Sequence, residues 1–231
     1  MSGNIPEKII EIRERIRLFE KRYDRAPNSV SLLAVSKTQS IHKIQEAIDC
    51  GQLAFGENYL QEAIGKIEQL GREPLQWHFI GPIQSNKTRP IAEYFDWVHS
   101  LDRLKVAKRL SAQRPAHLAP LKVLIQVNLD HEDSKAGLSL DELPELAKNI
   151  SRLEQLELVG LMSIPAPGKD FEKQRLCFRQ LKEARDALIN SGISSCRELS
   201  MGMSADYEAA IAEGASIIRI GTDIFGPRDK R

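Results

Sequence analysis

The chain has 231 residues, of which 42% are hydrophobic, so it can bury a sizeable core and has the length of a single α/β barrel. Its 33 Lys and Arg residues balance 32 Asp and Glu residues, and a formal net charge of +1 excludes a global electrostatic attraction to nucleic acid or to an anionic membrane. The three cysteines form no CxxC pair, which argues against a disulfide framework or a zinc site and fits a reducing cytosol.

The first predicted element is a helix over residues 5–25. Apolar residues recur along it at spacings of four and three, which places one apolar stripe on a helix. Asn4 is positioned to cap this helix, with Pro6 in the first turn and Glu7 three residues after the cap. The segment has no apolar signal core, and no stretch of the sequence approaches the roughly 18 apolar residues of a membrane span. We therefore expect a helix that docks on the rest of a cytoplasmic protein.

Beyond residue 30, short apolar runs alternate with amphipathic helical patterns. The eight runs predicted as strands cover residues 30–36, 53–56, 76–81, 95–100, 121–129, 156–164, 197–202 and 216–221. The helical patterns lie between them, at residues 41–50, 57–70, 86–94, 102–112, 139–153, 170–191 and 204–213. Such alternation favours a parallel sheet with right-handed crossovers, and eight strands close most naturally as a (β/α)8 barrel. An open doubly wound sheet is the alternative, but the fingerprint GxGxxG expected after its first strand is absent.

No composition shift or low-complexity linker divides the sequence, so we expect one domain over residues 1–231. It would consist of the docking helix at about 5–25 and the barrel at about 30–226. In such a barrel the C-terminal ends of the strands form one rim, and the active site lies there. The residues at these ends are therefore the candidate site residues.

A lysine and several polar side chains occupy these strand ends. Lys37 closes the first strand, Asn58 follows the second, and His78 and Met162 lie near the ends of the third and the sixth. A primary amine that emerges from so apolar a strand is a candidate nucleophile, because it can form a Schiff base with an aldehyde. The alternatives are a solvated lysine at position 37 and a histidine at position 78 that is simply packed in the core.

The last two strand ends predict a phosphate site. In "SMGMSADYEAA" a serine and a glycine precede a helix, and in "IRIGTDIFG" Gly221 and Thr222 form a second turn of small residues. Backbone N–H groups at such turns bind anions, and barrels often hold phosphate between the loops after strands seven and eight. The alternative is that the glycines only make tight turns. A lysine and a phosphate site on one rim suit a phosphorylated aldehyde that forms a Schiff base.

Six motifs follow one another along the chain: "LLAVSKTQ", "FGENYLQEA", "WHFIGPIQSNK", "GLMSIPAP", "ELSMGMSADYEAAIAEGAS" and "IRIGTDIFG". From about residue 5 to residue 227 the sequence resembles the YggS-type pyridoxal-phosphate-binding proteins, also called pyridoxal phosphate homeostasis proteins. The resemblance implies a barrel related to the N-terminal domain of bacterial alanine racemase, with pyridoxal 5′-phosphate (PLP) as cofactor. It also implies a part in PLP homeostasis and in amino-acid and keto-acid balance, without an established catalytic activity.

The resemblance also implies a role for each candidate residue. Lys37 would carry PLP covalently as a Schiff base, and Arg219 would face the pyridine nitrogen of the cofactor. The residues that would line the pocket are Asn58, His78 and Met162. The residues that would hold the phosphate are Ser200, Gly221 and Thr222.

Two other functions are compatible with these residues: a PLP-dependent amino-acid racemase, and an aldolase that uses the lysine on a sugar phosphate without a cofactor. Only bound PLP would make the protein yellow. A racemase of the alanine racemase type also needs a second, all-β domain that supplies another base, and we expect none here. Lys135, in "DHEDSK" on the same rim, is either a second amine that accepts aldehyde released from Lys37 or an exposed loop lysine.

The expected partners follow from the same observations. The histidines show no HxxxH or HxH spacing, so we expect no metal site. We expect a monomer that binds PLP and no nucleic acid or membrane. Enzymes that lack their PLP are candidate recipients of the cofactor.

Overall fold

Eight parallel strands close into a barrel, in which each strand pairs with the next along the chain and β8 pairs with β1. This computed structural model describes residues 4–129, 136–166, 168 and 170–226. The strands are β1 (Ser31–Val35), β2 (Ala54–Glu57), β3 (Gln76–Phe79), β4 (Trp97–Leu101), β5 (Leu121–Gln126), β6 (Leu156–Met162), β7 (Glu198–Ser200) and β8 (Ile217–Ile220). The predicted (β/α)8 barrel is confirmed, and the open sheet is wrong because its first and last strands would not pair.

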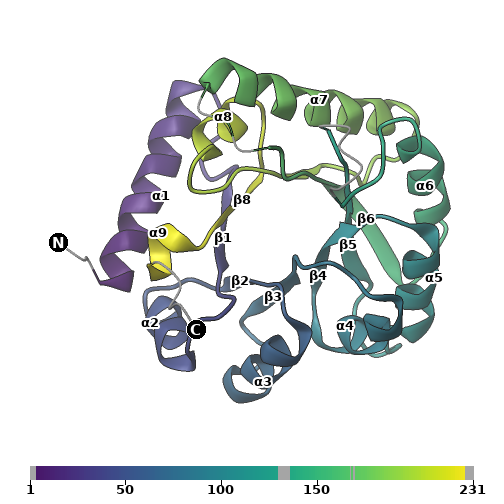
Figure 1. Cartoon of the computed structure of the whole chain (residues 1–231), viewed down its shortest axis with the longest axis horizontal. Coiled ribbons are helices and arrows are strands. Elements are labelled where there is room, and N and C mark those ends of the chain that lie inside the picture. The colour runs from purple at the N-terminus through teal and green to yellow at the C-terminus, as the bar shows by residue number, and fades with distance from the viewer. Residues whose placement is uncertain (1–3, 130–135, 167, 169, 227–231) are drawn as a thin grey trace.

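The helices surround this barrel (Figure 1). They are α1 (Ile5–Arg22), α2 (Ile41–Asp49), α3 (Leu60–Leu70), α4 (Thr88–Tyr94), α5 (Leu104–Gln113), α6 (Leu143–Ile150), α7 (Phe171–Asn190), α8 (Tyr207–Ala212) and α9 (Thr222–Phe225), with the 3-10 turn η1 (Ser85–Lys87) before α4. The short helix α9 was not predicted, because four residues are too few to show helical periodicity. Within the described part of the chain, no helix is both long and apolar enough to cross a membrane.

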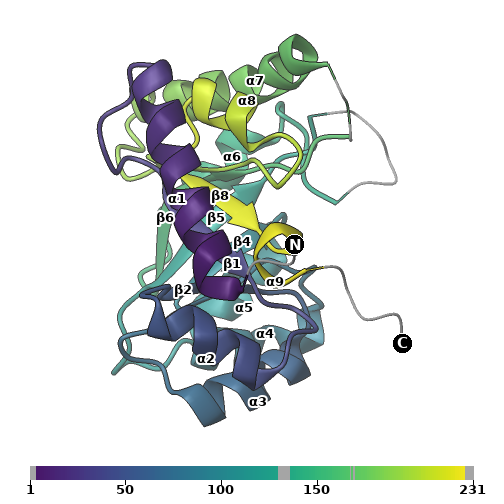
Figure 2. The same cartoon turned by 90° about the vertical axis from the view of Figure 1, so that its left-hand side faces the viewer.

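The N-terminal helix α1 packs across the first and last elements of the barrel. The Asn4 side chain accepts a hydrogen bond from the backbone N–H of Glu7, and the Glu7 carboxylate accepts one from the backbone N–H of Asn4, which confirms the predicted cap. The apolar stripe of α1 is buried, and the helix contacts α2, α8 and α9 (Figure 2). The buried carboxylate of Glu20 then accepts the backbone N–H of Val30 at 2.9 Å, which fixes the entry of the chain into β1.

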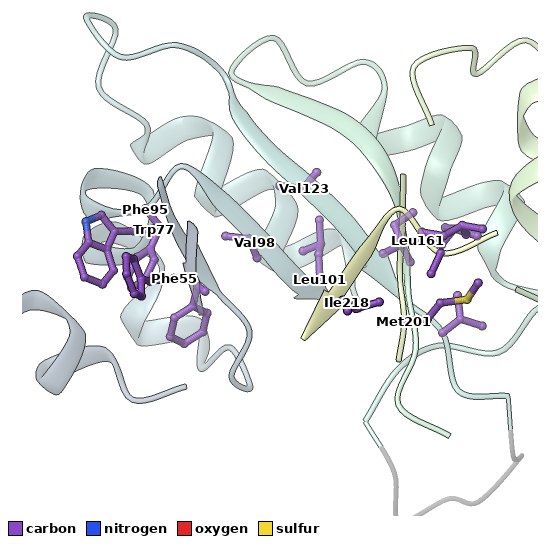
Figure 3. Packing of buried hydrophobic residues seen from close by; sticks show 14 of the residues in the cluster. Phe55, Trp77, Phe95, Val98, Leu101, Val123, Leu161, Met201 and Ile218 are labelled. Carbon is purple, nitrogen blue, oxygen red and sulfur yellow. The ribbon is translucent and has the colours of Figure 1, made fainter. Parts of the chain in front are cut away.

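The larger hydrophobic core lies between the outer face of the barrel and the helices. Successive side chains of a strand point to opposite faces, so Trp77 and Phe79 of β3 both point outward. The ring centre of Trp77 lies 5.6 Å from that of Phe55 (Figure 3). The ring centre of Phe79 lies 5.2 Å from that of Phe95. Burying each such side chain stabilises the fold by roughly 1.5–3 kcal/mol. This packing leaves the inward faces of the strands for polar groups and for a smaller apolar cluster around Met162.

A close contact between β6 and β7 gives a test of the strand packing. A Cβ atom at Gly160 would overlap the backbone carbonyl of Glu198, whereas one at Gly65 in α3 would meet nothing within 4 Å. We expect Gly160→Ala to lower the free energy of unfolding by at least about 2 kcal/mol, because backbone cannot move aside cheaply. Gly65→Ala should raise it by about 0.5–1 kcal/mol, since alanine favours a helix interior. Urea unfolding of the two variants measures both effects, and equal stabilities would contradict this description of the barrel.

Candidate functional site

A cavity of about 280 Å3 opens at the rim formed by the C-terminal ends of the strands. Its lining residues, taken from β1 to β8, are Val35, Lys37, Gln39, Asn58, Ile80, Met162, Ile164, Met203, Ser204, Ala205, Arg219, Gly221, Thr222 and Gly226. Of the predicted site residues, His78 and Ser200 are not part of this lining, and the others are. The volume is near the lower end of the range of about 300–1,000 Å3 found for small-molecule sites.

Lys37 enters the cavity from the turn that follows β1. The strand ends at Val35, one residue earlier than predicted, and Lys37 and Thr38 form a turn before α2. Thr38 has a φ of 63°, in the left-handed region, so the chain changes direction sharply at this point. Lys37 is half-buried and lines the cavity wall. The turn, rather than the strand, therefore sets the direction of its side chain.

Arg219 of β8 brings a buried cation to the inner wall of the cavity. Its side chain donates to the hydroxyl of Ser200 at 2.7 Å and to the backbone carbonyl of Ser163 at 2.9 Å. Burial lowers the pKa of Arg219 to about 10, and the charge of Asp206 opposes that shift. The guanidinium thus keeps its proton at neutral pH, and the two hydrogen bonds fix its plane.

Two buried histidines extend this hydrogen-bonded set through the barrel. Nδ1 of His99 lies 2.8 Å from the Ser200 hydroxyl, and Nε2 of His99 lies 2.9 Å from Nδ1 of His78. The strands of His99 and Ser200, β4 and β7, are not neighbours in the sheet, so this contact crosses the barrel interior. His78 also stacks on Trp97, at 5.0 Å between ring centres. Both His78 and Ser200 thus lie deeper than the cavity, where they support Arg219.

The loop after β7 brings a different serine to the cavity. Ser204, together with Met203 and Ala205, lines it, whereas Ser200 is fully buried at the end of the strand. Gly202 makes the intervening turn with a φ of 93°, a conformation that favours glycine. Asp206 stabilises the loop by accepting the backbone N–H of Met203 at 2.6 Å. The motif "SMGMS" contained both serines, but only the geometry of the turn shows which one reaches the cavity.

The turn after β8 completes the wall next to Lys37. A Cβ atom at Gly221 would lie 3.1 Å from the carbonyl oxygen of Val35, so a glycine lets the ends of β8 and β1 approach closely. Thr222 follows at the start of α9 and is exposed at the cavity mouth. The loops after β7 and β8 thus face the same cavity, as the sequence predicted.

Asn58 and Met162 occupy the remaining predicted positions. Met162 is fully buried at the end of β6, and Asn58 follows β2. The side-chain oxygen of Asn58 is buried and has no hydrogen-bond partner among the residues that the structure describes. A buried polar atom without a partner is costly, which points to a ligand group at this place. Lys135, the predicted second amine, lies outside the described residues.

The sequence was compared with those of known protein families and proteins. Residues 9–229 match the family "Alanine racemase, N-terminal domain". The pyridoxal phosphate homeostasis protein of Pseudomonas aeruginosa is 53% identical over 227 residues, which cover 98% of this chain and 97% of that protein. The chain belongs to the pyridoxal phosphate homeostasis protein family. The family member of Escherichia coli strain K12 is 49% identical over 230 residues, covering 98% of both chains.

A solved structure extends the comparison to the fold. The structure of PipY of Synechococcus elongatus PCC7942, with PLP bound, superposes on this chain with a TM-score of 0.85. The two sequences are 37% identical, and the match covers 96% of this chain and 100% of PipY. The barrel and the order of its elements are therefore those of a family member that holds PLP.

The buried histidines predict how stability depends on pH. Burial lowers the pKa of His78 to about 3, with a smaller effect of Lys122, and lowers that of His99 well below its usual value, with contributions from His78 and Arg219. The unfolded chain therefore binds protons that the barrel does not. Both histidines stabilise the fold fully above about pH 6.5, and this stabilisation is lost as the pH falls toward their folded pKa values.

Replacing one histidine should reduce by one the number of protons that the chain takes up when it unfolds at acidic pH. As the pH is lowered from 6 to 4, the free energy of unfolding of His78→Phe should fall less steeply than that of the unchanged protein. We expect the two slopes to differ by about 1.4 kcal/mol per pH unit. Phenylalanine can keep the stack on Trp97, so the variant should fold. The measurement is urea unfolding of ligand-free protein over this pH range. An unchanged slope would show that His78 is already protonated in the barrel.

Proposed function

We propose that this chain binds PLP through the amine of Lys37 and holds it as part of PLP homeostasis in the cytoplasm, without catalysing turnover. The observation that carries the proposal is that Lys37, Arg219 and two turns of small residues line one cavity. Family members from Pseudomonas aeruginosa and Escherichia coli are named for PLP homeostasis, and PipY has PLP bound. Their agreement over nearly the whole chain supports the same role here.

The residues of the cavity fit the chemical groups of PLP. The aldehyde requires a primary amine, which Lys37 supplies, and the phosphate requires hydrogen-bond donors, which the loops after β7 and β8 supply. The hydroxyls of Ser204 and Thr222 can donate together with backbone N–H groups of these loops. The apolar side chains of Ile80 and Met162 provide surfaces for an aromatic ring. The unpartnered oxygen of Asn58 fits a donor group on the ligand.

Each protein group then has a defined part in holding the ligand. When bound, PLP supplies an aldehyde carbon that an amine attacks with loss of water. Lys37 acts as that amine, and it must give up its ammonium proton before it attacks. The donors at Ser204 and Thr222 would form hydrogen bonds to the phosphate oxygens. Arg219 stays protonated and is fixed by Ser200 and Ser163, so it would donate a hydrogen bond to the ring nitrogen of PLP and would not transfer a proton to it.

The lining residues favour binding over racemisation. Pyridoxal enzymes draw the charge of a carbanion into a protonated ring, which a carboxylate usually stabilises. Among the described lining residues no side chain is a carboxylate, and none besides Lys37 has a side chain suited to act as a base. A racemase needs a base on each face of its substrate. The arrangement therefore suits a protein that takes up and releases the cofactor.

The remaining parts of the proposal concern the form in which the protein acts. We propose that residues 1–231 form one PLP-binding unit and that it works as a monomer. Enzymes that lack their PLP are the recipients that fit a role in homeostasis. The absence of a membrane-spanning helix in the described residues is compatible with the proposed place in the cytoplasm.

Trapping of the bound cofactor tests the role of Lys37. Purified protein with PLP should be yellow, and borohydride should fix a pyridoxyl group on the peptide that contains Lys37. Lys37→Ala should lose both signals. Lys43→Ala is the matched control, because this nearby ammonium donates to Gln39 and to the carbonyl of Phe225 and does not line the cavity. A major adduct on another lysine, with Lys37→Ala still yellow, would overturn the assignment.

A comparison of two ligands tests the phosphate site. Ser204→Ala should weaken binding of PLP by about tenfold, because a hydrogen bond to a charged group contributes about 1.5–3 kcal/mol. Unphosphorylated pyridoxal should be much less affected. Ser200→Ala should instead weaken both ligands alike, since Ser200 acts through Arg219. Absorbance titrations of the unchanged protein and the two variants give the six dissociation constants. If Ser200→Ala alone discriminates between the ligands, Ser200 rather than Ser204 holds the phosphate.

A further inference from the structure

The two residues that flank Lys37 are held by one helix. Lys66 of α3 donates to the backbone carbonyl of Ser36 at 2.7 Å. Glu62, one turn earlier on the same helix, accepts the backbone N–H of Thr38 at 2.6 Å. One bond thus fixes the carbonyl just before Lys37, and the other fixes the amide just after it. The peptide units on both sides of the lysine are tied to α3.

A network of two buried charges, Lys66 and Glu57, and the half-buried Glu62 underlies these two bonds. The ammonium group of Lys66 lies 2.8 Å from Oε1 of Glu57 and 2.5 Å from Oε1 of Glu62. The hydroxyl of Ser36 donates to the same oxygen of Glu57 at 2.6 Å. Lys66 is 5% exposed, and Glu57 is fully buried. With the Ser36 carbonyl, the two carboxylates give the three N–H donors of Lys66 one acceptor each.

A contribution to the stability of the fold does not by itself explain why Lys66, Glu57 and Glu62 are arranged in this way. A buried ion pair often contributes little to folding, because desolvation of the charges offsets their attraction. Here the network directs two of its bonds at backbone atoms of a single turn, and Thr38 in that turn has a φ of 63°. A threonine in the left-handed region costs free energy, so it persists only where surrounding contacts fix it. Glu62 and Lys66 supply such contacts, in addition to the hydrogen bond that the backbone N–H of Gln39 donates to the Ser36 carbonyl at 3.0 Å.

We propose that Glu57, Glu62 and Lys66 are positioning residues that hold the Lys37 turn in its binding conformation before any ligand enters. None of the three lines the cavity, so they act through the backbone on either side of Lys37. A preorganised amine binds its ligand more tightly, because the ordering of the turn is complete before binding. The effect on PLP rests on the proposed function, whereas the fixed turn is a property of the ligand-free protein.

The test uses Glu62, because its side chain is 28% exposed and its replacement should leave the barrel folded. Glu62→Ala removes the acceptor for the Thr38 N–H, and Glu62→Gln keeps a side-chain oxygen that can replace it. Glu68→Ala is the control on the same helix, since within the described part of the chain Glu68 accepts a side-chain hydrogen bond from Tyr94 alone, at 2.8 Å. In full-length ligand-free protein, the amide of Thr38 should lose its protection from hydrogen exchange in Glu62→Ala. It should stay protected in Glu62→Gln and in Glu68→Ala.

Binding of PLP is the second measurement on the same proteins. We expect Glu62→Ala to raise the dissociation constant about tenfold, as the freed turn must be ordered on binding. Glu62→Gln and Glu68→Ala should bind as the unchanged protein does. Lys66→Met, which removes the ammonium and its bond to Ser36, should weaken binding at least as much if it folds.

Three results would contradict parts of this account. Equal protection of Thr38 in Glu62→Ala and the unchanged protein would overturn the proposed network. So would weaker binding in all variants in proportion to their loss of unfolding free energy, because that pattern indicates a structural role alone. If the protein without substitutions forms no adduct with PLP, the proposed function is overturned instead. Hydrogen exchange of the Thr38 amide would still decide whether the turn is fixed.

Discussion

The pairing of β1 with β8 determines where this site lies. The register joins Ser31 to Ile217 and Ala34 to Ile220, so the two strands reach the rim side by side. Gly221 then lies against the carbonyl of Val35, a distance at which a side chain would crowd the strand. Because of this contact, the turn that carries Lys37 and the turn before α9 form one wall, although they are far apart in sequence. Without closure of the barrel, the amine of Lys37 and the loops after β7 and β8 would not share a cavity.

Some polar groups of the barrel line the cavity, and others hold those groups in place. Arg219 faces the cavity and stays protonated. The Ser200 hydroxyl accepts a hydrogen bond from Arg219, and the neutral His99 contacts the same hydroxyl. Glu57, Glu62 and Lys66 of the positioning network hold the turn of Lys37 and do not themselves line the cavity. Both sets place a cation at the edge of the barrel core and satisfy it with hydrogen bonds, as buried charges require.

The order of apolar runs and motifs predicted the barrel and six of the residues that line the cavity, because both depend on local patterns and on the rule that strand ends share a rim. The roles of Ser200 and His78 could not be predicted in the same way. Ser200 turns toward Arg219 because it is still within β7, whereas Ser204 lies beyond the Gly202 turn. The contact between His78 and His99 and the bond from Lys66 to Ser36 depend on how strands and helices pack, which no spacing in the sequence encodes.

The most direct test of the account is a crystal structure of the protein with PLP. We expect continuous electron density from Nζ of Lys37 to the cofactor, with the phosphate between residues 203–205 and residues 221–222. The ring nitrogen should face Arg219, and the backbone of the Lys37 turn should be unchanged from the ligand-free form. Cofactor bound to another lysine, or with its phosphate away from these two loops, would contradict the account.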